Sequence, residues 1–288
     1  MSYQSIFHPE LFKGQTIIVT GGGSGIGRCT AHELAALGAR VALVGRKIEK
    51  VEAVKAEIME DGGIASAHSC DIREEESVKA TVKTIIEEHG GLNGLVNNAG
   101  GQFPSPLAGI NQKGWETVVR TNLTGGFLVA REAYTQALAK TGGAIVNIVA
   151  DMWGGMPGMG HSGAARAGMV NFTQTAAVEW GTSGVRVNAV APGWIASSGM
   201  DNYPTHMKEW IRGLADHVPI KRMGTESEIS AAICFLLSPG AAYISGDCLR
   251  IDGAASQGTR MWPLPKAKNN EPFNGFHRAV TPKVLSED

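Results

Sequence analysis

A group of polar side chains lies in the segment from residue 151 to residue 166. The group consists of Asp151, His161, Ser162 and Arg166. A guanidinium keeps its proton at neutral pH, so Arg166 can hold hydroxyl groups or negative charge but cannot act as a general base. A serine hydroxyl donates a hydrogen bond worth about 1 kcal/mol but is a poor proton source. These residue types therefore favour stabilisation of a charged oxygen over transfer of a proton to it.

A glycine-rich segment, TGGGSGIG at residues 20–27, lies between a predicted strand and a predicted helix. Glycine allows a tight turn and the close approach of a pyrophosphate, and the helix N-terminus supplies N–H groups and a favourable dipole. The segment therefore predicts a dinucleotide site. Its expected contacts are Thr20, Gly21, Gly23, Ser24, Gly25, Ile26 and Gly27.

The end of the second predicted strand indicates which dinucleotide binds. An acidic residue there would hold the ribose 2′-hydroxyl of NAD, but this chain has Arg46 and Lys47. A guanidinium can bind a 2′-phosphate through two hydrogen bonds, which favours NADP(H). The alternative is that Arg46 is a solvated charge at the start of a helix. Asp71, after the third predicted strand, is placed to meet the adenine edge.

Short apolar runs alternate with segments of helical periodicity along most of the chain. Near-continuous apolar character indicates strands that are covered on both faces, as in a parallel sheet. The repeated units predict an α/β fold with a Rossmann-type, doubly wound parallel sheet of seven strands and helices on both faces. The predicted strands span residues 16–20, 40–44, 64–70, 94–98, 144–150, 185–191 and 248–252.

Composition narrows the possible partners. The 288 residues carry a formal net charge of −1, which gives no electrostatic reason to expect nucleic acid or a membrane as partner. No apolar run approaches the length of a membrane span, and the four cysteines lack metal-binding spacing, so we expect no metal and a reducing cytoplasmic setting. One domain is predicted over residues 1–258. An extended arm over residues 259–288 is either a partly ordered tail or packs on a neighbouring subunit.

Several short motifs follow the order found in the short-chain dehydrogenase/reductases, which the chain resembles over about residues 11–253. Besides the glycine loop they are NNAG (97–100), NLTG (122–125), APGWI (191–195) and YISGDCLRIDG (243–253). The resemblance implies a Rossmann-type fold, a nicotinamide cofactor and usually a homotetramer with its main interface near residues 114–140 and 163–180. It also implies that the cofactor contacts Ile72, Asn98, Ala99, Gly100, Arg166, Pro192, Gly193 and Ile195.

Two segments, GGQFPSP (100–106) and HSGAARAG (161–168), look most like the peroxisomal trans-2-enoyl-CoA reductases. A looser similarity runs to the 2,4-dienoyl-CoA reductases, which also carry serine in place of the family tyrosine, and to bacterial citronellol/citronellal dehydrogenases. Most family members use asparagine, serine, tyrosine and lysine in catalysis. Asn122, Ser162 and Arg166 take the asparagine, tyrosine and lysine positions. The serine position falls at Val149 or Ala150, and neither has a hydroxyl.

These replacements change which reaction is favoured. Carbonyl reduction leaves an alkoxide that must gain a proton, and losing the matched acid costs on the order of 10²–10⁴ in rate. Reduction of a C=C bond conjugated to a thioester instead spreads charge onto the thioester oxygen, which needs hydrogen-bond donors. The α carbon can then take its proton from water. Ser162, with a backbone N–H or a ribose hydroxyl, could supply such donors, so enoyl reduction is favoured.

Other side chains are candidates for the proton donor and for substrate contacts. Tyr203 lies in a predicted substrate lid over about residues 194–218 and either swings over the site or packs within the lid. Asp151 either faces the cleft or caps a loop, and His161 either relays a proton or is structural. The methionine-rich lid and facing loop suit an acyl chain or an acyclic terpenoid. The expected substrate contacts are Gln102, Phe103, Trp153 and Tyr203.

The sequence therefore predicts a cytoplasmic, NADPH-dependent oxidoreductase that reduces the C=C bond of a 2-enoyl thioester. Two alternatives stay open. One is a dehydrogenase of medium-chain or acyclic terpenoid alcohols or aldehydes that uses Asp151, His161 or Tyr203 for the proton. The other is an NADP(H)-binding protein with little turnover.

Overall fold

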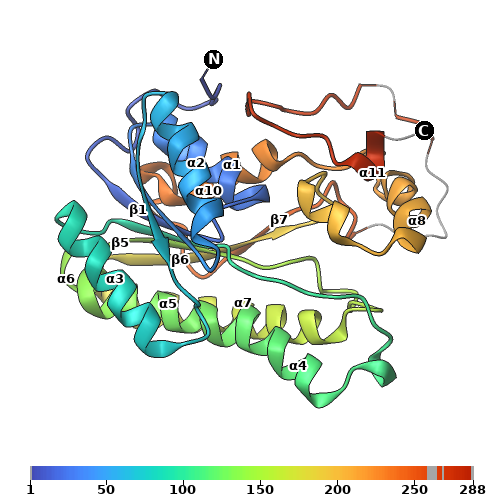
Figure 1. Ribbon diagram of the computed structural model, residues 1–288, viewed down its shortest axis with the longest axis horizontal. Coiled ribbons are helices and arrows are strands. Elements are labelled where there is room, and N and C mark those ends of the chain that lie inside the picture. Colours follow the sequence, from blue (N-terminus) through green and yellow to red (C-terminus); the bar gives the residue numbers. More distant parts are fainter. Residues whose placement is uncertain (1, 258–264, 268, 287–288) are drawn as a thin grey trace.

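The computed structural model describes residues 2–257, 265–267 and 269–286, and its strands form one seven-stranded sheet (Figure 1). Neighbouring strands are parallel, in the order β3-β2-β1-β4-β5-β6-β7. The strand order reverses at β1 and β4, as in Rossmann-type sheets, which confirms the predicted fold class. The strands are β1 (Thr16–Thr20), β2 (Arg40–Gly45), β3 (Ile64–Ser69), β4 (Gly94–Asn97), β5 (Gly143–Ile148), β6 (Val185–Pro192) and β7 (Cys248–Ile251).

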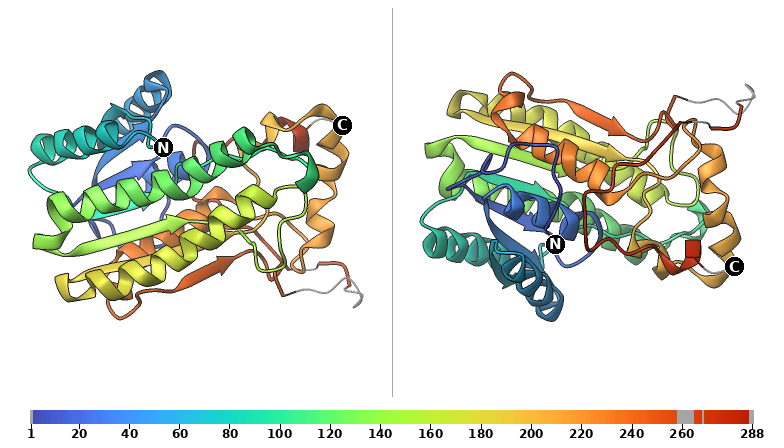
Figure 2. Two further views of the ribbon diagram at one scale, coloured as in Figure 1. Left: turned by 90° about the horizontal axis from the view of Figure 1, so that it is seen from below. Right: turned by 90° about the horizontal axis from the view of Figure 1, so that it is seen from above.

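Helices cover both faces of the sheet, and each face has its own apolar cluster. In β2, Val41 and Leu43 join one cluster while Ala42 and Val44 join the other, because successive side chains of a strand point to opposite faces. The opposite views of Figure 2 show α1 (Gly25–Ala36), α2 (Ile48–Glu60) and α10 (Glu226–Leu237) on one face, and α3 (Glu75–His89), α5 (Gly125–Ala133) and α7 (Gly160–Trp180) on the other.

The helical segment between β4 and β5 is interrupted by two wider turns. It consists of α4 (Gln112–Val119), the π-helical turn η2 (Arg120–Thr124), α5, a second π-helical turn η3 (Tyr134–Leu138) and α6 (Ala139–Thr141). Such turns are frequent at functional sites because the extra residue redirects side chains. The predicted site residue Asn122 lies in the first of these turns.

The lid predicted over residues 194–218 is built from short helices that follow β6. They are η5 (Ser198–Asn202), η6 (Thr205–Met207), α8 (Lys208–Arg212) and α9 (Leu214–His217). Met200, Ile211 and Leu214 form a small apolar cluster within it, which also contains Val284 from the far end of the chain. The lid therefore has a core of its own, separate from the two clusters of the sheet. None of the helices in the described residues is both long and apolar enough to cross a membrane.

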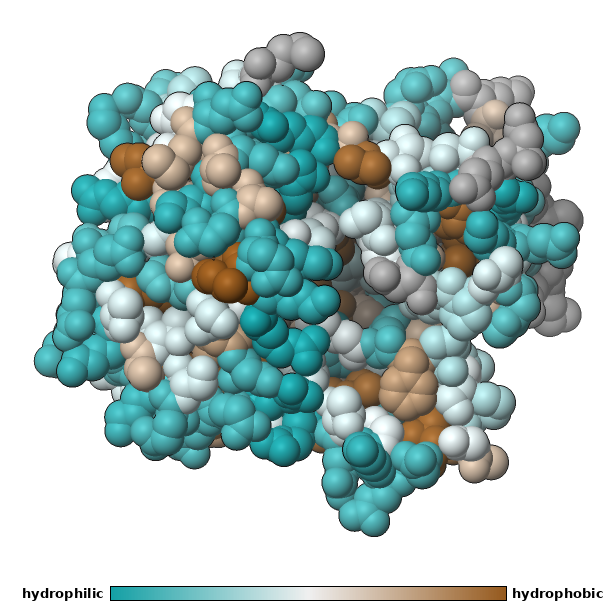
Figure 3. All heavy atoms as spheres, in the orientation of Figure 1, coloured by the Kyte–Doolittle hydropathy of each residue, from teal (hydrophilic) through white to brown (hydrophobic). Residues whose placement is uncertain are grey.

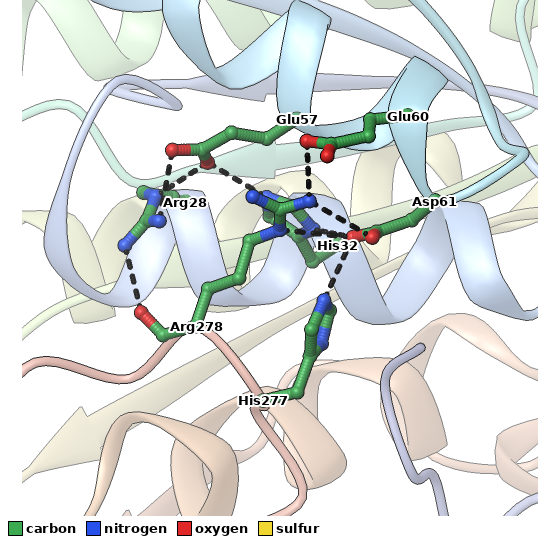
Figure 4. A network of polar contacts seen from close by, with 7 residues as sticks. All are labelled: Arg28, His32, Glu57, Glu60, Asp61, His277 and Arg278. Carbon is green, nitrogen blue, oxygen red and sulfur yellow. Dashed lines mark hydrogen bonds and ion pairs between the residues drawn. The ribbon is translucent and has the colours of Figure 1, made fainter. Parts of the chain in front are cut away.

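The described part of the C-terminal arm packs on its own chain. Near its end, α11 (Lys283–Ser286) lies against the lid, where the backbone N–H of Val284 donates to Asp201 at 3.2 Å. Upstream, Arg278 and His277 reach α2 and pair with Asp61, as Figure 4 shows. The prediction that the arm packs on a neighbouring subunit is not tested by a single chain. Residues 258–264, 268 and 287–288 lie outside the described residues.

Candidate active site

Two adjoining clefts lie at the carboxyl ends of the parallel strands, where doubly wound proteins bind their ligands. One cleft of about 440 Å³ runs over the glycine loop and the ends of β2 and β3. The other, of about 400 Å³, lies between the ends of β4, β5 and β6 and the lid. They share Gly21, Ser24, Ala99 and Gly100, so they form one continuous site. The face drawn in Figure 3 is mostly hydrophilic, with apolar side chains beside the hollow next to the lid.

The glycine loop brings the start of α1 close to the end of β1. A side chain on Gly27 would place its Cβ 2.4 Å from the carbonyl oxygen of Gly21, so only glycine fits there. Gly25 has a φ of 57°, in the left-handed region that favours glycine. Ser24 precedes α1 in an extended conformation, and its side chain makes no capping hydrogen bond. The N-terminus of α1 thus has the form of an anion site that can hold a pyrophosphate.

Most of the predicted cofactor residues line the continuous cleft, but three do not. Thr20 is fully buried, and its hydroxyl accepts hydrogen bonds from the backbone N–H groups of Asn98 and Ala99 at 3.0 and 2.9 Å. Thr20, Gly25 and Gly27 therefore shape the site from behind its surface. The residues that line it are Gly21, Gly23, Ser24, Ile26, Arg46, Lys47, Asp71, Ile72, Asn98, Ala99, Gly100, Arg166, Pro192, Gly193 and Ile195.

Cationic side chains dominate the end of the cleft that lies over β2 and β3. Arg46, Lys47, Lys50 and Arg73 all line it. The single carboxylate among its lining residues, Asp71, is paired with Arg73 at 2.5 Å, and this pairing lowers the pKa of Asp71 to about 2. Asp71 was expected to meet the adenine edge, but its carboxylate already has a partner. The excess of positive charge fits a dinucleotide that carries a further phosphate besides its pyrophosphate.

Asn122 holds the loop that follows β4. Its Oδ1 accepts from the N–H of Gly101, and its Nδ2 donates to the Gly101 carbonyl, both at 2.9 Å. The side chain is 3% exposed and is not among the residues that line the cleft. Asn122 therefore acts on the site through the backbone of the loop it holds.

Arg166 enters the cleft from α7. Its Nη1 donates to the carbonyl oxygen of Ile148 at 2.6 Å, whereas its buried Nε has no hydrogen-bond partner. Burial disfavours the charged form and lowers the pKa of Arg166 to about 10, so the guanidinium is still charged at neutral pH. A buried cation with an unmet donor is suited to bind ligand oxygens.

Three predicted residues form a hydrogen-bonded chain from the body of the protein to the lid. The hydroxyl of Ser162 donates to Oε1 of Gln102 at 2.7 Å. This bond orients the Gln102 amide so that Nε2 donates to the hydroxyl oxygen of Tyr203 at 3.3 Å. Ser162 is fully buried, and Gln102 and Tyr203 line the cleft in front of it. Of this chain of residues, the groups that line the cleft are therefore the Gln102 amide and the Tyr203 hydroxyl.

Asp151 and His161 flank the site without lining it. The Oδ1 atom of Asp151 is buried without a hydrogen-bond partner. Burial and the nearby charge of Asp252 raise its pKa. His161 is fully buried, and its Nδ1 accepts from the backbone N–H of Ser162 at 2.9 Å. Since the Ser162 hydroxyl bonds to Gln102 instead, the position of His161 fits a structural role.

The other two predicted substrate contacts lie outside the cleft. The ring of Phe103 packs edge-on against His161, with ring centres 4.5 Å apart. The ring of Trp153 lies under the guanidinium of Arg250 at 3.9 Å. Three residues that line the cleft were not predicted from the sequence: Lys50, Arg73 and Gly101. Arg73 could have been found, because it lies only two residues after the predicted contact Asp71.

Comparison with known proteins identifies relatives of the chain. A family model described as enoyl-(acyl carrier protein) reductase matches residues 21–256. The chain is 37% identical to a probable 2,4-dienoyl-CoA reductase of Bacillus subtilis, over 83% of this chain and 95% of the relative.

Two solved structures share the fold. A citronellol catabolism dehydrogenase of Pseudomonas aeruginosa is 69% identical, with a TM-score of 0.81 over 88% of this chain and 100% of the other. An actinorhodin polyketide ketoreductase with NADPH is 30% identical, with a TM-score of 0.82 over 87% of this chain and 100% of the other. The sheet order, the glycine loop and these matches lead to one conclusion: the chain belongs to the short-chain dehydrogenase/reductase family of oxidoreductases, whose members bind nicotinamide cofactors.

Proposed function

We propose that this protein is an NADPH-dependent reductase of the C=C bond of a 2-enoyl thioester. The observation that carries the proposal is the chain Ser162–Gln102–Tyr203. Most family members use a tyrosine as proton donor. Here two hydrogen-bond donors line the cleft in its place, the Gln102 amide and the Tyr203 hydroxyl. Such donors suit an oxyanion that forms on a thioester oxygen.

The preference for NADPH over NADH rests on the end of the cleft that lies over β2 and β3. Arg46, Lys47 and Arg73 line it, and the carboxylate of Asp71 is already paired with Arg73. No carboxylate follows Gly45 directly to hold a ribose 2′-hydroxyl. A 2′-phosphate would instead gain charge-assisted hydrogen bonds from this cluster.

Each residue of the site has a separate role in the proposed reaction. When bound, NADPH supplies the hydride that reaches the β carbon. Gln102 and Tyr203 donate hydrogen bonds to the thioester oxygen as it gains negative charge, while Ser162 keeps the Gln102 amide in the donating orientation. Arg166 holds ribose hydroxyls and contributes positive charge. The α carbon then takes a proton from water, so no side chain has to be a strong acid.

A second candidate is a dehydrogenase of an acyclic terpenoid alcohol or aldehyde. It is favoured by the 69% identity to the citronellol catabolism dehydrogenase. In that reaction an alkoxide must gain a proton, and Tyr203 is the side chain that would supply it. Its hydroxyl oxygen accepts from Gln102, which leaves its own proton for a substrate oxygen.

The family also suggests a homotetramer, and one surface supports this. Trp115, Phe127 and Val178 project from α4, α5 and α7, and all three are exposed, Val178 by 81%. Large apolar side chains at the surface favour association between subunits. We propose that these helices form the main interface and that gel filtration at micromolar concentration will give a tetramer.

The deciding experiment measures NADPH oxidation with trans-2-decenoyl-CoA and, separately, with citronellal. Turnover of the thioester alone, weakened by Gln102→Leu, supports the enoyl reductase. Turnover of citronellal alone, lost in Tyr203→Phe, supports the dehydrogenase. NADPH binding without turnover of either compound would contradict both and favour a cofactor-binding protein of low activity.

A further inference from the structure

Two histidines converge at the edge of the sheet, away from the cleft. His68 lies in the edge strand β3, and His89 is the last residue of α3. The Nε2 atoms of both rings lie within hydrogen-bond distance of the hydroxyl of Ser66, at 2.7 and 2.8 Å. Ser66 and His68 are two residues apart in the strand, so both side chains lie on the face covered by α3.

A carboxylate completes the group. Oε2 of Glu88 lies 3.6 Å from Nε2 of His68. One ligand atom from each of His68, Glu88 and His89 lies within 4.8 Å of the others. Donors around a tetrahedral zinc ion lie about 3.3 Å apart, because Zn–N and Zn–O bonds are about 2.0–2.2 Å long. The His68–Glu88 pair nearly meets this spacing, and small side-chain rotations would bring the third donor in.

The surroundings suit a cation that binds to neutral imidazoles. The C-terminal carbonyl groups of α3 place partial negative charge beside His89. The side chain of His68 is mostly buried, at 10% exposed, and a metal ion would bind the unprotonated form of each ring. Glu88 is 48% exposed, which leaves the group open to solvent on that side.

We propose that His68, His89 and Glu88 form a binding site for Zn²⁺ or a similar divalent transition metal ion, with water as the fourth ligand. Two imidazoles and one carboxylate are a ligand set that suits zinc, copper and nickel better than magnesium or calcium. The hydroxyl of Ser66 can donate to only one of the two rings and must accept from the other. A bound ion replaces that arrangement and requires both Nε2 atoms to be unprotonated.

Binding here joins two elements that are far apart in the sequence. β3 is an edge strand that pairs only with β2, and α3 ends beside it. The ion ties the end of the helix to the strand and so stabilises this edge of the folded protein. The cysteine spacing gave no hint of such a site, because its ligands are histidines from separate elements.

The test uses the full-length protein after treatment with EDTA. Zn²⁺ is titrated against a chromogenic chelator, and Tm is measured with and without Zn²⁺ or Mg²⁺. We expect one zinc ion per chain, a rise of Tm with Zn²⁺ but not with Mg²⁺, and a loss of affinity of about tenfold or more in His89→Gln. Co²⁺ should give the visible absorption of a tetrahedral site without thiolate ligands.

Two further variants keep the test decisive. Glu88→Gln changes an exposed side chain, so it should fold as well as the parent and still bind zinc more weakly. His206→Gln, on the exposed face of η6, is the matched control and should bind zinc as the parent does. Binding of NADPH reports that each variant is folded. Equal zinc affinity in the parent, His89→Gln and Glu88→Gln would overturn the proposal, as would the lack of any stoichiometric binding.

Discussion

The end of the cleft that contains Arg166 and the anchor of the C-terminal arm both enclose cationic side chains, but these side chains have different partners. In the arm anchor, which consists of Arg28, His32, Glu57, Asp61 and Arg278, each guanidinium faces carboxylates (Figure 4). Arg28 donates to both oxygens of Glu57 at 2.8 and 2.9 Å. Arg278 donates to both oxygens of Asp61 at 3.1 and 3.0 Å.

The guanidinium of Arg166 in the cleft has no such carboxylate partner among the described residues. Arg166 has one hydrogen bond, to a backbone carbonyl, and its buried Nε has none. An unmet donor on a buried cation lowers the stability of the fold, so we expect a ligand to satisfy Arg166. The comparison predicts that the arm anchor is structural and that Arg166 binds a ligand.

The largest expected effect comes from Arg166→Met. If the guanidinium serves a ligand, kcat/KM should fall by about 10²–10³, the cost of removing one donor from a charge-stabilising site. The free energy of unfolding should stay the same or rise, since an unpaired buried charge is lost. Steady-state kinetics and urea unfolding measure both. A clearly destabilised variant with normal kinetics would refute the assignment of Arg166 to ligand binding.

Tyr203→Phe tests the chain of donors that reaches the lid. Removing the hydroxyl should lower kcat/KM by about 10–100-fold, because one of two donors to the substrate oxygen is lost. The fold should be unaffected, since the hydroxyl is exposed to the cleft and bonds only weakly to Gln102. Asp151→Asn is the comparison variant and should leave kcat largely unchanged. A large loss of kcat in Asp151→Asn, together with normal kinetics in Tyr203→Phe, would make Asp151 the proton donor.

Replacing Arg278 with methionine should have the opposite effect to Arg166→Met: stability should fall while activity is kept. Its charge-assisted hydrogen bonds to Asp61 and Glu60 are lost, which should lower the free energy of unfolding by about 2 kcal/mol. Activity should change little. Lys13→Met removes an exposed ion pair with Glu10 and should leave the free energy of unfolding almost unchanged. Equal effects of the two variants would show that the arm anchor contributes no more than a surface pair.

The sequence predicted the strands that bound the cleft well, but it predicted the side-chain contacts between distant residues poorly. All seven strands lie within two residues of their predicted bounds. The central strands β1, β4, β5 and β6 are almost entirely buried apolar runs, which is the pattern that a parallel sheet predicts. The positions of Arg46, Ser162 and Arg166 follow from that frame. The fold class could therefore be predicted with little help from the family resemblance.

The contacts that depend on side-chain direction could not be predicted. Whether Asp71 pairs with Arg73 or meets a ligand depends on one rotamer. The shielding of Ser162 by Gln102 joins residues that are 60 positions apart. The pairing of Arg278 with Asp61 spans 217 positions and has no local signal. Periodicity locates an element, but it does not show which distant charge will lie against it.

The smallest expected effect tests whether the arm anchor includes a charged histidine. His32 faces Glu57 at 3.0 Å and Asp61 at 3.4 Å, with Arg28 and His277 also close. Burial disfavours its charged form more than the two carboxylates favour it, so the pKa of His32 is lowered. The folded protein then binds fewer protons than the unfolded chain, and stability should decline as pH falls below about 6.5.

The slope of that decline separates two states of the anchor. One proton contributes at most about 1.4 kcal/mol per pH unit, and His68 and His89, whose pKa values are also lowered, add to it. His32→Gln should therefore flatten, but not abolish, the loss of unfolding free energy between about pH 6.5 and pH 5. A charged His32 held by Glu57 and Asp61 would have a raised pKa and would stabilise the fold as pH falls. In that case the substitution would make the slope steeper, and the anchor would rest on a third cation beside Arg28 and Arg278.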